Sequence, residues 1–239
     1  PDGTRYTYGL PAYNNVQREK IFANNNPAIT AYTDEDITTY NAADVGTAND
    51  EGVDHYFSET EIPAYVHSHL ITQITSADYV DLTDNGPSED DFGFYTKFNY
   101  TKVAAYKWRE PYFDANYMKG YYSNKADDKS AYTYGEKDLY YIQSIETKTH
   151  IAVFYLGDRN DGKGVSLEDQ LAGSPKGSSQ KYLQKIVLFS KEDPNYGTVN
   201  AIPLQTVFFQ YSYELCPGVY NNDGGSVDPD HFIGTNAGG

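Results

Sequence analysis

Residues 92–108 read FGFYTKFNYTKVAAYKW, and aromatic and polar side chains alternate along most of this stretch. Successive side chains of an extended strand point to opposite faces of a sheet. One face of the stretch therefore carries the even-numbered residues Phe92, Phe94, Thr96, Phe98 and Tyr100. The opposite face carries Tyr95, Lys97, Asn99 and Thr101. This period of two predicts a long β-strand over Phe92–Trp108.

Further strands are predicted on both sides of this one, because short apolar and aromatic runs recur along the chain. They are Arg5–Tyr8, Gln17–Phe22, Ala64–Thr75, Asp138–Thr147, Thr149–Leu156, Lys181–Ser190 and Leu204–Leu215. Gly, Pro, Asn and Asp between the runs supply turns. No strand alternates with a long helix, as a parallel α/β sheet would require. We predict an all-β fold, either an antiparallel β-sandwich or an extended multi-stranded sheet with long irregular loops.

The chain of 239 residues suits one β-rich segment, with irregular excursions at 24–61 and 217–239. A short helix is predicted near Asp34–Tyr40, and one or two helical turns at Val165–Leu171. Loops are predicted at Leu10–Asn15, Gly157–Gly164 and Lys191–Pro203. The opening Pro1 and the glycine-rich end lead us to expect a segment of a larger chain.

Composition excludes two classes of partner. The net charge is −16, and such an acidic surface repels nucleic acid phosphates and anionic lipid. No run of 18 apolar residues occurs, so direct membrane insertion is not expected. The aromatic content of 15%, with 25 tyrosines, favours half-buried sheet surfaces over helices. The single cysteine, Cys216, excludes an intramolecular disulfide.

The acidic stretch Asp81–Asp91 is the candidate site, because its opening follows the spacing of a calcium-binding loop. Calcium binds six to eight oxygen ligands, which alternate residues of a tight loop can supply. The predicted ligands are Asp81, Thr83, Asn85, Pro87, Asp90 and Asp91. Phe92 occupies the position where a closing glutamate is expected, so a plain acidic turn is the alternative. Calcium is the only cofactor predicted.

Two other constellations carry weaker signals. His67 and His69 would point to one face of a strand and could hold zinc, or be ordinary surface histidines. The segment Asp158–Gly164 is one residue short of the calcium spacing and is predicted to be a turn. None of the common hydrolase, nucleotide-binding or metalloprotease motifs occurs. No catalytic residue is predicted, and the sequence favours a non-catalytic role without excluding an enzyme.

Several stretches resemble the very large, uncharacterised secreted or surface proteins of Bacteroidota. They are Gly3–Asn14, Lys97–Lys102, Ser144–His150 and Thr206–Cys216. The tyrosine-rich strands also resemble, more weakly, RHS-type shell proteins. The first resemblance implies export, a giant parent chain and a structural or adhesive role.

We therefore expect a non-catalytic structural or adhesion segment that is extracellular or lies on the bacterial outer surface. Its partners would be other segments of the parent chain, surface proteins or glycans. One alternative is a carbohydrate-binding or carbohydrate-active module, with a groove lined by Trp108, the tyrosines of Tyr112–Tyr122 and two facing carboxylates. Another is an RHS-type toxin shell segment, in which long strands curve around a cavity.

Overall fold

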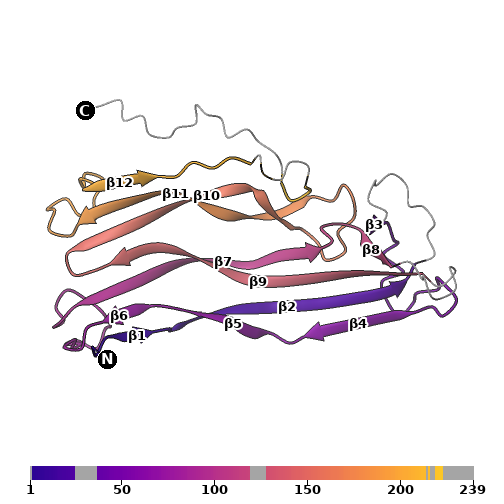
Figure 1. The fold of residues 1–239 in the computed structure, drawn as a ribbon, viewed down its shortest axis with the longest axis horizontal. Helices are drawn as coiled ribbons and strands as arrows, with labels where there is room; N and C mark the ends of the chain where they lie inside the picture. The colour runs from indigo at the N-terminus through magenta and orange to yellow at the C-terminus, as the bar shows by residue number, and fades with distance from the viewer. Residues whose placement is uncertain (1, 25–36, 119–127, 214, 216–218, 223–239) are drawn as a thin grey trace.

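A computed structural model describes residues 2–24, 37–118, 128–213, 215 and 219–222 (Figure 1). Over these residues the chain is all-β, without a helix, and therefore without a helix able to span a membrane. Twelve strands form one antiparallel sheet that does not close on itself. This confirms the predicted fold class.

The strands vary from two residues to eighteen. They are β1 Arg5–Thr7, β2 Leu10–Ala23, β3 Ile37–Thr38, β4 Phe57–Ile62, β5 Tyr65–Leu70, β6 Gln73–Thr75, β7 Tyr95–Glu110, β8 Ala115–Met118, β9 Lys129–Glu146, β10 His150–Val165, β11 Lys176–Ser190 and β12 Gln205–Phe208.

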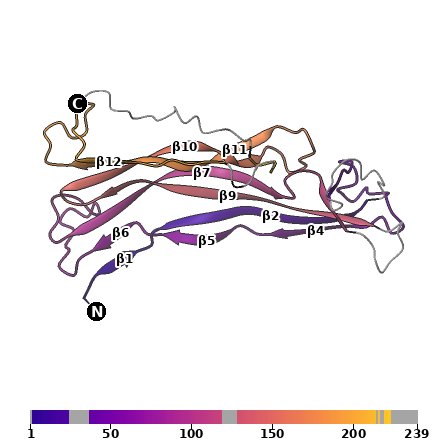
Figure 2. The same ribbon diagram turned by 45° about the horizontal axis from the view of Figure 1, so that its top comes forward.

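The pair of long strands β7 and β9 organises the sheet. β9 pairs with β7 along most of its length, with β2 through its N-terminal half and with β10 at its C-terminal end. β2 continues the sheet to β4 and β5, while β10 continues it to β11 and β12. β1 joins through β6 to the start of β7. Figures 1 and 2 show the long strands running along the long axis of one twisted sheet.

The hydrophobic core lies at one end of this sheet, where β2 ends and β9 begins. Its buried members are Phe22, Tyr40, Ala115, Tyr132, Tyr134 and Val165. Phe22 and Tyr132 come from neighbouring strands, and Tyr40 stacks on Tyr132 with 5.9 Å between ring centroids. The aromatic rings therefore fill the space between the sheet and the loops that cover it.

Two stretches predicted as a turn and a loop belong to strands, because the strands continue through their turn-like composition. Leu10–Asn15, predicted as a turn, begins β2 and pairs with β5. Gly157–Gly164, predicted as a loop, belongs to β10, including the predicted turn Asp158–Gly164. Register shifts near both stretches show β-bulges, which absorb extra residues without ending a strand.

β7 confirms the strand predicted over Phe92–Trp108, although it begins at Tyr95. Phe92 and Phe94 precede the strand and are exposed. The single alternating period predicted for the strand is interrupted by register shifts between Asn99 and Tyr100 and between Val103 and Tyr106. Such bulges change which face the following side chains occupy.

The described residues do not contain the predicted helices. Residues 34–36 lie outside the description, and Ile37–Thr38 forms β3 against β8, as β-branched side chains favour. Val165 ends β10, and the rest of Val165–Leu171 is irregular because buried side chains hold it against the sheet. Within the excursion predicted at 24–61, the structure describes β3 and most of β4.

The predicted hairpin with a long loop at Lys191–Pro203 is confirmed. β11 pairs with β12, whose register runs from Leu188 opposite Gln205 to Lys185 opposite Phe208. β12 ends earlier than the predicted strand Leu204–Leu215. Of the excursion predicted at 217–239, only residues 219–222 are described, and Cys216 lies outside the description.

Candidate functional sites

The loop Asp81–Asp91 closes through backbone donors that point at its first carboxylate. Asp81 accepts hydrogen bonds from the N–H groups of Thr83, Asn85 and Gly86, the last at 2.8 Å. Asp84 and Gly86 have positive φ angles, which allow the chain to curl around this carboxylate. The predicted opening of the loop is therefore a tight turn centred on Asp81.

Asp91 closes the same loop from the inside. It is buried, and its carboxylate accepts hydrogen bonds from the Tyr79 hydroxyl and from the N–H groups of Leu82 and Ser88. Burial alone would raise the pKa of Asp91, but these donors stabilise the charged form and lower its pKa. The Ser88 hydroxyl likewise lowers the pKa of Asp90.

The predicted calcium ligands lie in one loop, but their carboxylates do not meet. Over the described residues, Asp81, Asp90 and Asp91 do not form a group whose ligand oxygens all lie within 4.8 Å of one another. Lys148 donates to the Asp91 carbonyl, and Lys191 lies 3.5 Å from Glu89. The loop geometry thus leaves calcium as a prediction, beside the alternative of a hydrogen-bonded turn.

Sequence reasoning missed an acidic group elsewhere. Asp44, Asp50 and Glu51 place one carboxylate oxygen each within 4.8 Å of one another. Asp44 is buried and accepts the N–H of Asn41. The three acidic residues lie close together in the sequence, which is a weak signal for a metal site. The surrounding stretch is polar throughout, so nothing in the sequence distinguishes them as ligands.

His67 and His69 lie on β5, where the burial of side chains alternates. Both are exposed, and the register shift in the pairing with β2 falls at His67. Among the described residues, neither belongs to a group of three potential metal ligands. The pair therefore stays an unsupported zinc hypothesis.

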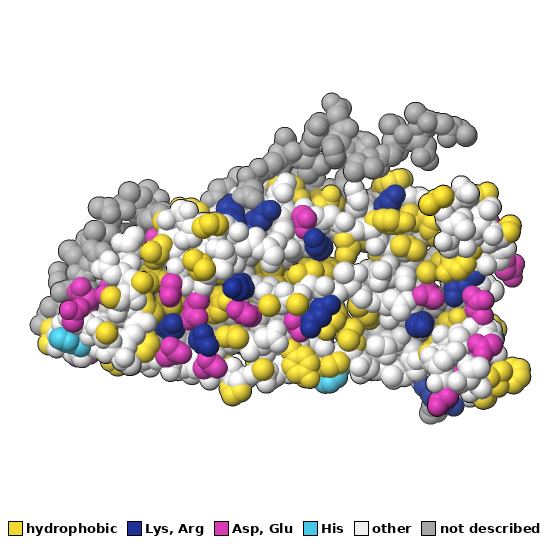
Figure 3. Space-filling model, turned by 180° about the vertical axis from the view of Figure 1, so that it is seen from behind, with side chains coloured by type: hydrophobic (Ala, Val, Ile, Leu, Met, Phe, Trp, Pro, Cys, Tyr) yellow, Lys and Arg dark blue, Asp and Glu magenta, His cyan; other side chains and the backbone are white. Residues whose placement is uncertain are grey.

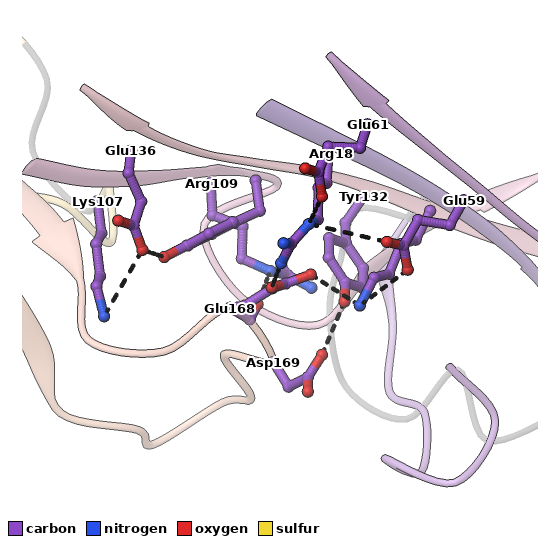
Figure 4. A network of polar contacts seen from close by, with 11 residues as sticks. Arg18, Glu59, Glu61, Lys107, Arg109, Tyr132, Glu136, Glu168 and Asp169 are labelled. Carbon is purple, nitrogen blue, oxygen red and sulfur yellow. Dashed lines mark hydrogen bonds and ion pairs between the residues drawn. The ribbon is translucent and has the colours of Figure 1, made fainter. Parts of the chain in front are cut away.

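A network of charged side chains links the sheet to the loop after β10 (Figure 4). Glu168 in this loop pairs with Arg18 at 2.9 Å and with Lys20 at 2.7 Å, both on β2. Arg18 also pairs with Glu61 of β4 at 2.6 Å. The Tyr132 hydroxyl donates to Asp169 at 2.7 Å. These contacts tie residues 166–171 down on β2 and β9.

Arg109 of β7 is the buried centre of this network. Its guanidinium donates to the carbonyls of Glu168 and Pro111 and to the Tyr40 hydroxyl, at 2.8–3.0 Å. It also lies 3.9 Å from the centroid of the Tyr132 ring, within the range of a cation–π contact. Burial lowers the pKa of Arg109 and raises that of Tyr40 to about 12. Arg109 is therefore a buried cation whose contacts hold the loops against the sheet, which is a structural role.

No sequence motif marks this network, because its members are far apart in the chain. Glu168 and Arg18 are 150 residues apart, and Arg109 and Tyr40 are 69 apart. The only available signal was an arginine at the end of an aromatic strand.

An open groove lies where β10 and β11 bulge. Arg159, Asp161, Tyr182, Tyr211 and Tyr213 are among its lining residues, and its cavity volume is about 270 Å³. Of the carboxylates described, only Asp161 lines it, and Trp108 does not. The groove predicted for a carbohydrate-active module, with Trp108 and two facing carboxylates, therefore differs from this one.

Comparisons with known proteins give no relative. No protein-family model matches the chain, and neither a curated protein nor a solved structure matches it. Function must therefore be argued from the fold and its surfaces.

Proposed function

We propose that this chain is a non-catalytic structural or adhesion segment of a giant secreted or surface-exposed bacterial protein. The main support is a group of large apolar side chains that are exposed at the end of the sheet away from the core. The core lies at one end of the sheet, whereas the opposite end presents large apolar side chains to solvent. A surface of this kind is typical of a part that packs against more protein.

The apolar end patch consists of Tyr6, Val80, Leu82, Phe92 and Phe94, all of which are exposed. Phe94 is 74% exposed and Phe92 62%. Figure 3 shows hydrophobic side chains at this end of the molecule, at its lower right.

Backbone pairing holds the patch together. Val80 and Phe92 form a β-bridge, and the Phe94 carbonyl accepts the N–H of Ser76, which follows β6. Tyr6 lies on β1, which pairs with β6. The patch is therefore one surface assembled from β1, the Asp81–Asp91 loop and the entry to β7. Other segments of the parent chain or surface proteins are the proposed partners.

The long strands support one alternative. β2, β7, β9, β10 and β11 contain 14 to 18 residues each, as the RHS-type shell hypothesis requires. In that alternative the same patch would contact the next strip of the shell.

Location and parent size can be tested together in the source bacterium. An antibody against this chain should detect a polypeptide much larger than 26.8 kDa. Protease added to intact cells should degrade it, because we propose an extracellular location. Detection of a 26.8 kDa species that only lysis exposes to protease would contradict the proposal.

Calcium binding by the Asp81–Asp91 loop stays part of the proposal. The support is the oxygen-rich loop that begins at Asp81 and has left-handed backbone at Asp84 and Gly86. Calorimetric titration of calcium into chelator-treated protein should show binding, and Asp81→Ala should abolish it. An absence of heat, with no change in melting temperature, would leave the hydrogen-bonded turn as the explanation.

A further inference from the structure

The groove at the bulge of β10 and β11 combines aromatic rings with a paired cation and anion. A second hollow of about 410 Å³ shares Asp161, Ser212 and Tyr213 with it, so the two form a continuous depression. The second hollow is in the volume range of small-molecule sites, and the first lies just below it. The depression therefore has room for a ligand of more than one ring.

The tyrosines form a fixed corner. Tyr182 lies opposite Gly157, and a side-chain carbon at Gly157 would come within 2.6 Å of the Tyr182 ring. This ring therefore covers the glycine, as aromatic residues often do across a strand pair. Tyr211 meets Tyr182 edge to face, with 5.3 Å between centroids and 64° between planes. Tyr211 is still 40% exposed, so part of its surface faces the groove and solvent.

The charged groups of the groove are already paired. Arg159 binds both oxygens of Asp161, through Nε at 2.8 Å and Nη2 at 2.7 Å. Lys181 pairs with Asp158. The pairing raises the pKa of Arg159 and lowers that of Asp161, so both stay charged at neutral pH. Arg159 and Asp161 neutralise each other in the lining, and Asp158 outside the lining neutralises Lys181, so an ionic ligand gains little net attraction here.

We infer that this groove binds a neutral saccharide. A sugar ring has an apolar C–H face, which can pack on the exposed face of Tyr211. Its rim of hydroxyls both donates and accepts hydrogen bonds. The guanidinium of Arg159 offers donors and the carboxylate of Asp161 offers acceptors to such a rim. A purely apolar ligand would leave this rigid polar pair without new partners, and a phosphate would meet Asp161.

The inference goes beyond the proposed structural role and does not depend on it. The probes are soluble neutral oligosaccharides with glucose, xylose, mannose or galactose backbones, titrated to millimolar concentration. Calorimetry should detect binding of at least one of them. Tyr211→Ala should weaken that binding several-fold, because the sugar face loses the apolar surface on which it packs. Tyr211→Phe should keep it, because the ring face is retained.

Tyr196→Ala is the matched control, since Tyr196 is similarly exposed but lies in the loop between β11 and β12. It should leave saccharide affinity unchanged. Arg159→Met should weaken binding through loss of donors, and equal melting temperatures would show that each variant folds. Binding of none of the probes, or affinity unaffected by both Tyr211→Ala and Arg159→Met, would overturn the inference. Binding of inorganic phosphate in preference to every oligosaccharide would also overturn it.

Discussion

Arg109 places a positive charge against the ring of Tyr132 inside the core. Its guanidinium donates hydrogen bonds to three oxygens. One of these is the carbonyl oxygen of Glu168, in the loop that covers the sheet. A buried cation is costly to desolvate, and only a full set of partners offsets this. The residue therefore makes the core dependent on one side chain.

Replacing Arg109 by Met should lower the free energy of unfolding by about 1–3 kcal/mol, the cost of leaving buried acceptors without their donor. The Tyr40 hydroxyl and two carbonyls would lose their donor. Urea unfolding followed by tyrosine and tryptophan fluorescence measures this change. Arg5→Met, at an exposed position of β1, is the control and should change stability by less than about 0.5 kcal/mol. Similar effects for both variants would contradict the assigned role.

Position 135 has no room for a side chain, because the ring of Trp108 lies close to Gly135. Trp108 lies opposite it on β7, and a side-chain carbon at Gly135 would come within 2.5 Å of the indole. Gly135→Ala should therefore lower the free energy of unfolding by about 1–3 kcal/mol through overpacking. Gly46→Ala is the control, because the added carbon meets nothing within 4 Å. Its free energy of unfolding should stay close to that of the unsubstituted protein. Thermal unfolding of both variants measures the difference.

At the scale of elements, the long strands depend on irregular positions within them. Ala105 lies within β7 with a φ of 51°, inside the register shift between Val103 and Tyr106. Asp138 of β9 accepts the N–H of Ala105 and pairs with Lys102 at 2.9 Å. The bulge is thus held by a cross-strand carboxylate, which lets β7 continue past a residue that would otherwise end it.

A left-handed backbone costs a non-glycine residue about 1–2 kcal/mol, which exceeds the entropic cost of a glycine. Ala105→Gly should therefore raise the free energy of unfolding by ~0.5–1 kcal/mol. Ala104→Gly, one residue earlier and without a positive φ, should lower it by a similar amount. Chemical unfolding of the two variants checks the opposite signs. Destabilisation by both would show that Ala105 is not strained.

At the scale of the whole molecule, the open sheet with its core at one end leaves the apolar end patch in water. The isolated chain should therefore self-associate through this patch as its concentration rises. The double variant Phe92→Ser with Phe94→Ser should shift the sedimentation profile toward the monomer. Val199→Ser, at a fully exposed position in the β11–β12 loop, is the control and should not. If the unsubstituted chain stays monomeric at all concentrations, this prediction is contradicted.

The candidate sites show how far spacing along the chain can lead. Asp81 and Asp91 were predicted to share one loop, and they do, because they are only ten positions apart in the chain. How the loop uses their oxygens was not predictable, since backbone donors compete with any cation for them. The groove was missed because Tyr182 and Tyr211 meet only through the pairing of β11 with the chain after β12.

The sequence by itself determined that this protein is all-β and antiparallel, because alternation of side chains and turn residues are local properties. It also determined the long-looped hairpin before β12. Only the tertiary structure decided that β2 and β10 extend through turn-like stretches, because bulges and partner strands outweigh local preference there. It also decided where Arg109, Glu168 and Tyr132 meet, since contacts between distant residues depend on strand pairing that no local pattern encodes.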